Sequence, residues 1–181
     1  VSNIDIIEVI AEKLRQYKAV NIVVDPVMVS TSGSKLLSDN AIDTLKTQLF
    51  SIATVITPNI PEAEVLTGSS IKSKEDMQRA AEEISKWTKG SVLVKGGHLE
   101  DCADDLLYTK ENTYWFETPK IGNPNTHGTG CTLSSAIACN LASGLNIVES
   151  IKNAKDYITG ALKAGLQLGK GRGPLNHCYN L

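Results

Sequence analysis

Three short apolar segments rich in β-branched residues constrain the fold of this 181-residue chain most strongly. They cover residues 21–24, 54–57 and 92–95, and each stops at a turn that contains proline or glycine. Short apolar runs between such turns are typical of strands that are buried on both faces of a sheet. Segments with helical periodicity separate the three runs, so we expect successive βαβ units and a parallel sheet.

Helix-capping residues place the helices between these strands. Helices are expected to start after four N-capping residues: Ser2, Ser38, Ser73 and Asn146. The first helix should bury a face formed by Ile6, Ile7, Ile10 and Leu14. A short helix over residues 62–66 is expected to end at Gly68.

The segment from residue 104 to 117 has a different pattern. Two β-like runs, residues 105–108 and 113–116, flank the polar turn 110–112, which predicts a β-hairpin. Neither an internal repeat nor a low-complexity segment or linker interrupts the sequence. We therefore expect a single domain over residues 1–181.

Composition limits the classes of partner. The net charge is -2 and the lysines are scattered, so the sequence gives no electrostatic footprint for nucleic acid and favours a small-molecule partner. Apolar runs stay well short of the roughly 18 residues that a membrane helix needs. The first residues lack the pattern of a signal peptide, so we expect a cytoplasmic protein without a membrane partner. The four cysteines lack the spacing of zinc ligands, and we expect reduced thiols.

The segment Asn-Thr-His-Gly-Thr-Gly-Cys, residues 125–131, predicts an anion-binding loop in front of a helix of small residues. Gly128 and Gly130 allow backbone conformations in which successive N–H groups point at one anion, and the helix dipole favours negative charge there. Cys131 lies in the first helical turn, where the same field lowers the pKa of a thiol. The alternative interpretation is an ordinary tight turn with Cys131 as a small buried hydrophobic residue.

Polar residues follow all three predicted strands, namely Asp25, Asn59 with Glu62, and Lys95. The carboxyl edge of a parallel sheet is where such folds place their binding sites. Carboxylates hold Mg²⁺, while lysine and backbone N–H groups neutralise phosphate charge, so this set suits MgATP. Each residue alone has a simpler interpretation as a turn cap, a helix cap or a solvated strand end. Their occurrence at corresponding positions favours a phosphoryl-transfer site.

Four motifs together resemble those of a known enzyme family. They are D-P-V-M at 25–28, T-P-N-x-x-E-A at 57–63, V-L-V-K-G-G-H at 92–98 and N-T-H-G-T-G-C at 125–131. The sequence is similar to the hydroxymethylpyrimidine and phosphomethylpyrimidine kinases of thiamine biosynthesis, in the ribokinase-like superfamily. This resemblance implies an α/β, ribokinase-like three-layer sandwich with a mostly parallel sheet flanked by helices. Cys131 stands where most of that superfamily carries an acidic residue, and cysteine there is typical of the pyrimidine branch and of some pyridoxal kinases.

The resemblance also implies an activity, which is ATP-dependent phosphorylation of 4-amino-5-hydroxymethyl-2-methylpyrimidine and its monophosphate, with ATP and Mg²⁺ as cofactors. It assigns the anion hole for the migrating γ-phosphoryl group to Gly128, Thr129 and Gly130, with Thr129 also counted among the ATP-binding residues. Cys131 would act as, or replace, the base for the substrate hydroxyl. The resemblance assigns the remaining roles as follows: Mg²⁺ to Asp25 and Glu62, the ATP phosphates to Asn59 and Lys95, and a backbone contact with the pyrimidine to Val27.

The chain corresponds to the C-terminal part of a family member, which ordinarily begins with further strands and helices. Those segments carry residues that bind the pyrimidine, so we expect the nucleotide half of the site here and an incomplete acceptor half. An open sheet edge would recruit another strand, exchange elements or aggregate, and the family favours a homodimer. Two alternatives stay open besides an inactive truncated kinase, namely a pyridoxal kinase and a non-catalytic nucleotide-binding module.

Overall fold

The computed structural model describes residues 3–29, 36–97, 103–118, 121–123, 127–166, 168 and 173–180. The chain divides into two compact units, Val1–Thr118 and Pro119–Leu181. Among the described residues, the first unit holds five β-strands and four α-helices, and the second holds two α-helices. The single domain predicted over residues 1–181 stays a prediction.

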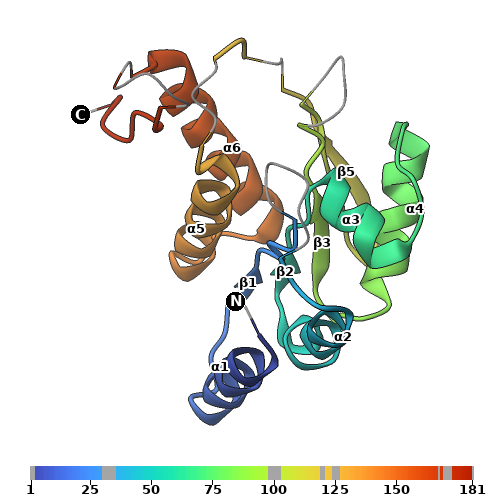
Figure 1. Cartoon of the computed structure of the whole chain (residues 1–181). Helices are drawn as coiled ribbons and strands as arrows, with labels where there is room; N and C mark the ends of the chain where they lie inside the picture. The colour runs from blue at the N-terminus through green and yellow to red at the C-terminus, as the bar shows by residue number, and fades with distance from the viewer. Residues whose placement is uncertain are drawn as a thin grey trace. The chain divides into compact units, whose positions relative to one another are not determined.

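One sheet in the order β1-β2-β3-β4-β5 organises the first unit (Figure 1). Its strands are β1 (Val23–Val24), β2 (Val55–Ile56), β3 (Ser91–Val94), β4 (Asp105–Tyr108) and β5 (Thr113–Phe116). The first three strands are parallel, whereas β4 and β5 form an antiparallel hairpin that pairs with β3. The predicted parallel strands and the predicted hairpin are both confirmed, and the hairpin makes the sheet mixed.

The register of the parallel strands brings their carboxyl ends to the same edge. Val23 pairs with Val55, and Val55 pairs with Ser91 on the other side. A parallel bridge between Asn59 and Lys95 continues the pairing beyond the ends of β2 and β3. Residues that directly follow these strands are therefore neighbours in space, as the sequence predicts.

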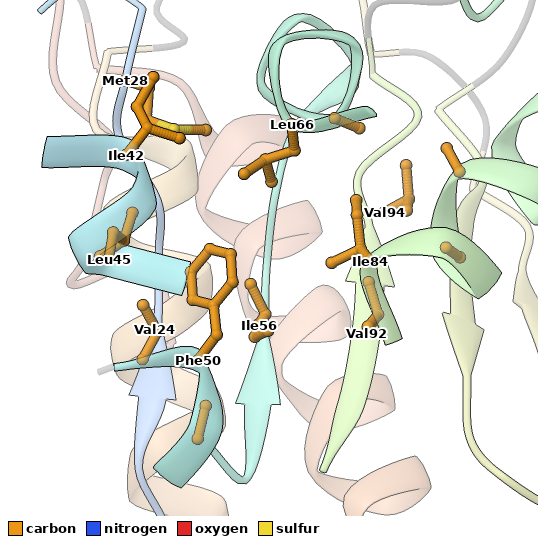
Figure 2. Close-up of a cluster of buried hydrophobic side chains, with 14 of the residues drawn as sticks. Val24, Met28, Ile42, Leu45, Phe50, Ile56, Leu66, Ile84, Val92 and Val94 are labelled. Carbon is orange, nitrogen blue, oxygen red and sulfur yellow. The ribbon is translucent and has the colours of Figure 1, made fainter. Parts of the chain in front are cut away.

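Helices and strands of the first unit share one hydrophobic core. Its helical elements are α1 (Ile4–Gln16), α2 (Asp39–Gln48), the 3-10 turn η1 (Phe50–Ile52), α3 (Ile60–Thr67) and α4 (Lys74–Ser85). Figure 2 shows the fully buried Phe50 ring beside Val24 of β1 and Ile56 of β2, with Leu45 of α2 close by. This packing on β1, β2 and β3 holds their carboxyl ends in place.

Asn3 caps the first helix, one residue later than predicted, and the predicted cap Ser2 lies outside the described residues. The side-chain oxygen of Asn3 accepts the N–H of Ile6 at 2.9 Å. Asparagine is as good an N-cap as serine, so the pattern does not separate two adjacent candidates. Ile6 was predicted in the buried face but is 43% exposed, since the face that packs on the core centres on Ile7 and Ala11.

The other helix boundaries follow their capping residues. Ser38 and Ser73 cap α2 and α4, and Ser73 forms the capping box with Asp76. Gly68 ends α3 in the left-handed conformation, with φ of 71°, which glycine adopts at little cost. These predictions are confirmed.

The second unit is a pair of helices, α5 (Thr129–Ala142) and α6 (Ile147–Ala164) (Figure 1). The buried residues of the pair are Leu133, Ile137 and Leu141 of α5 and Ser150, Ile151, Ala154, Ile158 and Ala161 of α6. Asn146 caps α6 as predicted, by accepting the N–H of Glu149 at 2.9 Å. The helix ends at Ala164, and the backbone leaves the helical conformation at Gly165.

Membrane-spanning helices are absent from the part of the chain that the structure describes, since none of its helices combines the necessary length and apolarity.

Candidate functional site

The carboxyl edge of the three parallel strands carries a hydrogen-bonded group of three side chains. Asp25 follows β1, Thr57 follows β2 and Lys95 follows β3. The Lys95 ammonium donates to Oδ1 of Asp25 at 2.7 Å, and the Thr57 hydroxyl donates to the same oxygen at 3.1 Å. The side chains of Lys95 and Asp25 are only 13% and 14% exposed. The strand pairing explains this group, because it brings residues 32 and 70 positions apart together.

Asn59 and Glu62 lie at the start of α3, beside the same edge. The Asn59 side chain accepts the N–H of Glu62 at 2.9 Å, and the Glu62 carboxylate accepts the N–H of Asn59 at 2.8 Å. This is a capping box, so the simpler interpretation of both residues as helix caps is confirmed. Glu62 is nevertheless 2% exposed, which is unusual for a capping carboxylate.

Burial raises the proton affinity of the Glu62 carboxyl group. Loss of hydration raises its pKa from 4.5 to about 7. Hydrogen bonds from the backbone N–H groups of Asn59 and Met28, together with the charge of Lys95, lower the pKa, whereas the charge of Asp25 raises it. Glu62 is therefore close to half protonated at neutral pH, and a cation bound beside it would favour the ionised form.

The oxygen donors at this edge fit a magnesium ion that a nucleotide carries. Mg²⁺ usually binds through one or two carboxylates and completes its shell with waters and substrate phosphates. Asp25 and Glu62 are two such carboxylates, close enough for the charge of one to shift the pKa of the other. Clusters of three or more His, Cys, Asp or Glu side chains are absent from the described residues. The donor set therefore suits a nucleotide-bound Mg²⁺ better than a site built from protein ligands alone.

The glycine loop lies in the second unit, at the start of α5. Gly128 is the N-cap residue with φ of 81°, a conformation that favours glycine. The N–H groups of Thr129 and Gly130 lie in the first turn of α5, at the positive end of the helix dipole. Gly130 has helical geometry. Of the two glycines, only Gly128 therefore adopts the left-handed conformation that was expected of both. Asn125 and Thr126 lie outside the described residues.

Cys131 is the third residue of α5, and its side chain is exposed. The interpretation of Cys131 as a small buried hydrophobic residue is therefore wrong. Its thiol is free, as are the thiols of Cys139 and Cys178. Gly128 and Cys131 line a groove of about 660 Å³ in this unit. Tyr157 and His177 line the same groove.

Val27 lies in the turn that follows β1 in the first unit. The Val27 side chain is 45% exposed, and its backbone N–H donates to the carbonyl oxygen of Asp25 at 3.0 Å. The N–H is thus used inside the turn, while the role predicted for the Val27 backbone toward a pyrimidine stays a prediction. His98 of the same predicted edge lies outside the described residues.

Thr57 is the residue of this group that sequence reasoning did not single out. It appeared only as the first letter of the T-P-N motif, at the end of a predicted strand. Because β1 and β2 are adjacent and parallel, Thr57 and Asp25 follow their strands at the same edge, and the register of the two strands brings the hydroxyl beside Asp25. The structure thus brings together Asp25, Thr57, Asn59, Glu62 and Lys95 in the first unit, and Gly128 to Cys131 form a continuous loop and helix start in the second.

Comparison with known proteins gives one family. The family model described as "Phosphomethylpyrimidine kinase" matches residues 1–176. A hydroxymethylpyrimidine/phosphomethylpyrimidine kinase of Streptomyces coelicolor is 42% identical over 180 residues, which are 99% of this chain and 66% of that protein. The chain thus spans about two thirds of the length of this curated relative.

Solved structures agree with the family match. The phosphomethylpyrimidine kinase of Clostridium difficile 630 has a TM-score of 0.76 and 43% identity, over 88% of this chain and 64% of that one. An ADP complex of Bacillus subtilis pyridoxal kinase has a TM-score of 0.87 and 37% identity, over 97% of this chain and 66% of that one. The predicted ribokinase-like α/β fold, with a sheet flanked by helices, is confirmed by these likenesses.

Proposed function

This chain belongs to the phosphomethylpyrimidine kinase family, and on this premise we propose that the protein transfers the γ-phosphoryl group of ATP to 4-amino-5-hydroxymethyl-2-methylpyrimidine and to its monophosphate. The observation that carries the proposal is the pair of carboxylates, Asp25 and Glu62, beside the Lys95 ammonium at the carboxyl edge of the parallel strands. Two carboxylates and a fixed positive charge are what a MgATP site needs from a protein.

Asp25 and Glu62 would hold Mg²⁺, directly or through water. The ion supplies charge neutralisation on the phosphate oxygens. Lys95 and Asn59 would lie near the ATP phosphates, where the ammonium of Lys95 adds a second positive charge. The ion pair between Lys95 and Asp25 already fixes that ammonium, so its charge is in place before the nucleotide binds.

Gly128, Thr129 and Gly130 would form the anion hole for the γ-phosphoryl group. Their place at the start of α5 supports this role, because the N–H groups and the helix dipole there both attract negative charge. The substrate oxygen would form a bond to the γ-phosphorus while the bond from that phosphorus to the ADP oxygen breaks. The proton of a hydroxyl substrate would pass to Cys131, or to a base that replaces it, and the exposure of Cys131 at the helix start leaves it accessible.

The same proposal includes the contact with the acceptor, the compartment and the oligomeric state. The Val27 backbone would contact the pyrimidine, and its exposed turn beside Asp25 leaves space for an acceptor. We also propose that the protein works in the cytoplasm as a homodimer. Free thiols at Cys131, Cys139 and Cys178 suit a reducing compartment.

A second candidate function is phosphorylation of pyridoxal. The likeness to the Bacillus subtilis pyridoxal kinase favours it, because the TM-score of 0.87 covers nearly the whole of this chain. Both acceptors are aromatic heterocycles with a hydroxymethyl group, so the phosphoryl-transfer residues do not separate them. A non-catalytic nucleotide-binding module is the remaining alternative.

Release of ADP by this chain with MgATP tests the three functions. The assay compares hydroxymethylpyrimidine, pyridoxal and no acceptor, with Gly130→Asp as the control that places a negative charge at the anion hole. ADP release that requires the pyrimidine and is lost in the control supports the proposal. Release with pyridoxal alone supports the second candidate, and binding of MgATP without release with any acceptor supports the non-catalytic module.

A further inference from the structure

Thr57 is held at both its backbone and its side chain against the end of β1. Its N–H donates to the carbonyl oxygen of Val24 at 3.0 Å, and its hydroxyl donates to Oδ1 of Asp25 at 3.1 Å. The residue is fully buried. A β-branched side chain has restricted χ1 rotation, so the hydroxyl of a buried threonine has an almost fixed position.

The two side chains that donate hydrogen bonds to Asp25 differ in flexibility. Lys95 reaches Oδ1 from the end of a flexible stem of four carbons, and its ammonium can follow a carboxylate that rotates. The Thr57 hydroxyl cannot follow in this way. The rotation of the Asp25 carboxylate is therefore set by Thr57 more than by Lys95.

The arrangement leaves the two oxygens of Asp25 unequal. Oδ1 accepts both hydrogen bonds, while within the described residues Oδ2 accepts none. A carboxylate that is fixed through one oxygen presents the other in a constant direction. Residues that orient a metal ligand in this manner commonly affect metal affinity or activity by about 10- to 100-fold when they are changed.

We propose that Thr57 is a positioning residue, whose hydroxyl fixes the Asp25 carboxylate so that the second oxygen is available to the Mg²⁺ of a bound nucleotide. This inference rests on the proposed function and adds a residue to it. Thr57 acts through Asp25 and touches neither nucleotide nor acceptor in this scheme. If the Thr57 hydroxyl only satisfied its own hydrogen bond, its removal would leave the Mg²⁺ dependence of ADP binding unchanged.

The test compares Thr57→Val with Thr57→Ser in the full chain. Valine keeps the shape and removes the hydroxyl, whereas serine keeps the hydroxyl. Calorimetric titration measures ADP binding with and without Mg²⁺, and the Mg²⁺ dependence of ADP release is measured in parallel. Thr88→Val is the matched control, because Thr88 is also buried in the first unit, and its hydroxyl donates to the carbonyl oxygen of Ala53.

The expected result is specific to the metal. Thr57→Val should leave Mg²⁺-free ADP binding unchanged and raise the Mg²⁺ concentration for half-maximal binding about 10- to 100-fold. Thr57→Ser keeps the hydroxyl without the β-branch and should restore part of the loss, and Thr88→Val should match the wild type. Thr57→Ala provides a second variant without the hydroxyl, and the fluorescence of Trp87 and Trp115 reports whether each variant has folded.

Two outcomes overturn the inference in distinguishable ways. Wild-type Mg²⁺ dependence in both Thr57→Val and Thr57→Ala, or an equal loss in Thr57→Ser, contradicts the positioning role alone. A wild-type chain that shows no Mg²⁺-dependent ADP binding contradicts the proposed function, and the inference fails with it.

Discussion

Replacing Glu62 with glutamine should make the folded chain more stable at neutral and alkaline pH. The carboxyl group of Glu62 is 2% exposed, and burial raises its pKa from 4.5 to about 7. Glutamine has the same shape and retains an oxygen that can accept the N–H of Asn59, so the capping box at the start of α3 persists. The substitution therefore removes the charge and one acceptor oxygen, while the N–H of Asn59 keeps its partner.

The direction and size of the effect follow from proton linkage. Between pH 4.5 and about 7 the folded chain binds more protons at Glu62 than the unfolded chain does. The free energy of unfolding therefore falls as the pH rises through this window, and the full contribution is present only below the unfolded pKa. Each pKa unit corresponds to about 1.4 kcal/mol, so ionised Glu62 should lower the stability by about 3 kcal/mol above the folded pKa.

Urea unfolding at about pH 4 and about pH 8 measures this effect. Trp87 and Trp115 both belong to the unit that contains Glu62, so their fluorescence reports its unfolding. Near pH 4 the wild type and Glu62→Gln should have similar stability, because the wild-type carboxyl group is protonated in both states. Near pH 8 the variant should be more stable by about 3 kcal/mol. Other titrating groups cancel in the difference between the two proteins.

A difference in stability that stays constant between these two pH values would refute the reasoning. It would mean that the hydrogen bonds from Asn59 and Met28 and the charge of Lys95 compensate for burial completely. The same variant tests function separately, since a neutral amide is a poor ligand for Mg²⁺. Glu62→Gln should therefore bind ADP with a weaker dependence on Mg²⁺ although it is the more stable protein.

Three further substitutions give independent tests. Lys95→Met removes one partner of a part-buried ion pair and should lower the free energy of unfolding in urea titrations at neutral pH, by less than the about 3 to 5 kcal/mol typical of a fully buried pair. Gly128→Ala forces a side chain into a left-handed conformation and should cost about 1 to 2 kcal/mol, with reduced ADP release in the kinase assay. Gly90→Ala brings a Cβ into a clash with the backbone oxygen of Thr54 and should lower the free energy of unfolding by about 1 to 3 kcal/mol, whereas Gly97→Ala, with open space at its Cβ, should change it little.

Much of the fold could be predicted because local patterns and the final structure agree. Short apolar runs end at proline or glycine, and capping residues precede several helices, so the parallel strands, the hairpin and the starts of α2, α4 and α6 follow from the sequence. The prediction was wrong where two adjacent residues offer equal capping chemistry, as at Asn3 and Ser2. It was also wrong for Ile6, because the helical periodicity does not fix which side of a wide apolar face meets the core.

The sequence predicts which residues form the candidate site better than it predicts the contacts between them. Asp25 and Lys95 could be placed at one sheet edge, but not at 2.7 Å from each other, because that contact depends on strand register. Glu62 offered two interpretations, and the structure supports the helix cap while it also buries the carboxylate beside Asp25. Burial of a capping residue depends on the packing of distant segments, which local patterns do not contain.

The burial of Glu62 is difficult to explain by stability alone. A capping box needs only an exposed carboxylate or amide, and an ionised group in this position lowers the stability at neutral pH. The charge of Asp25 adds to this unfavourable environment, and Lys95 offsets only part of it. A divalent cation at the same edge would reverse the balance, because it attracts both carboxylates and favours their ionised forms. The unfavourable burial of the Glu62 carboxylate therefore has a physical rationale in the proposed function, in which this edge receives the Mg²⁺ of a nucleotide.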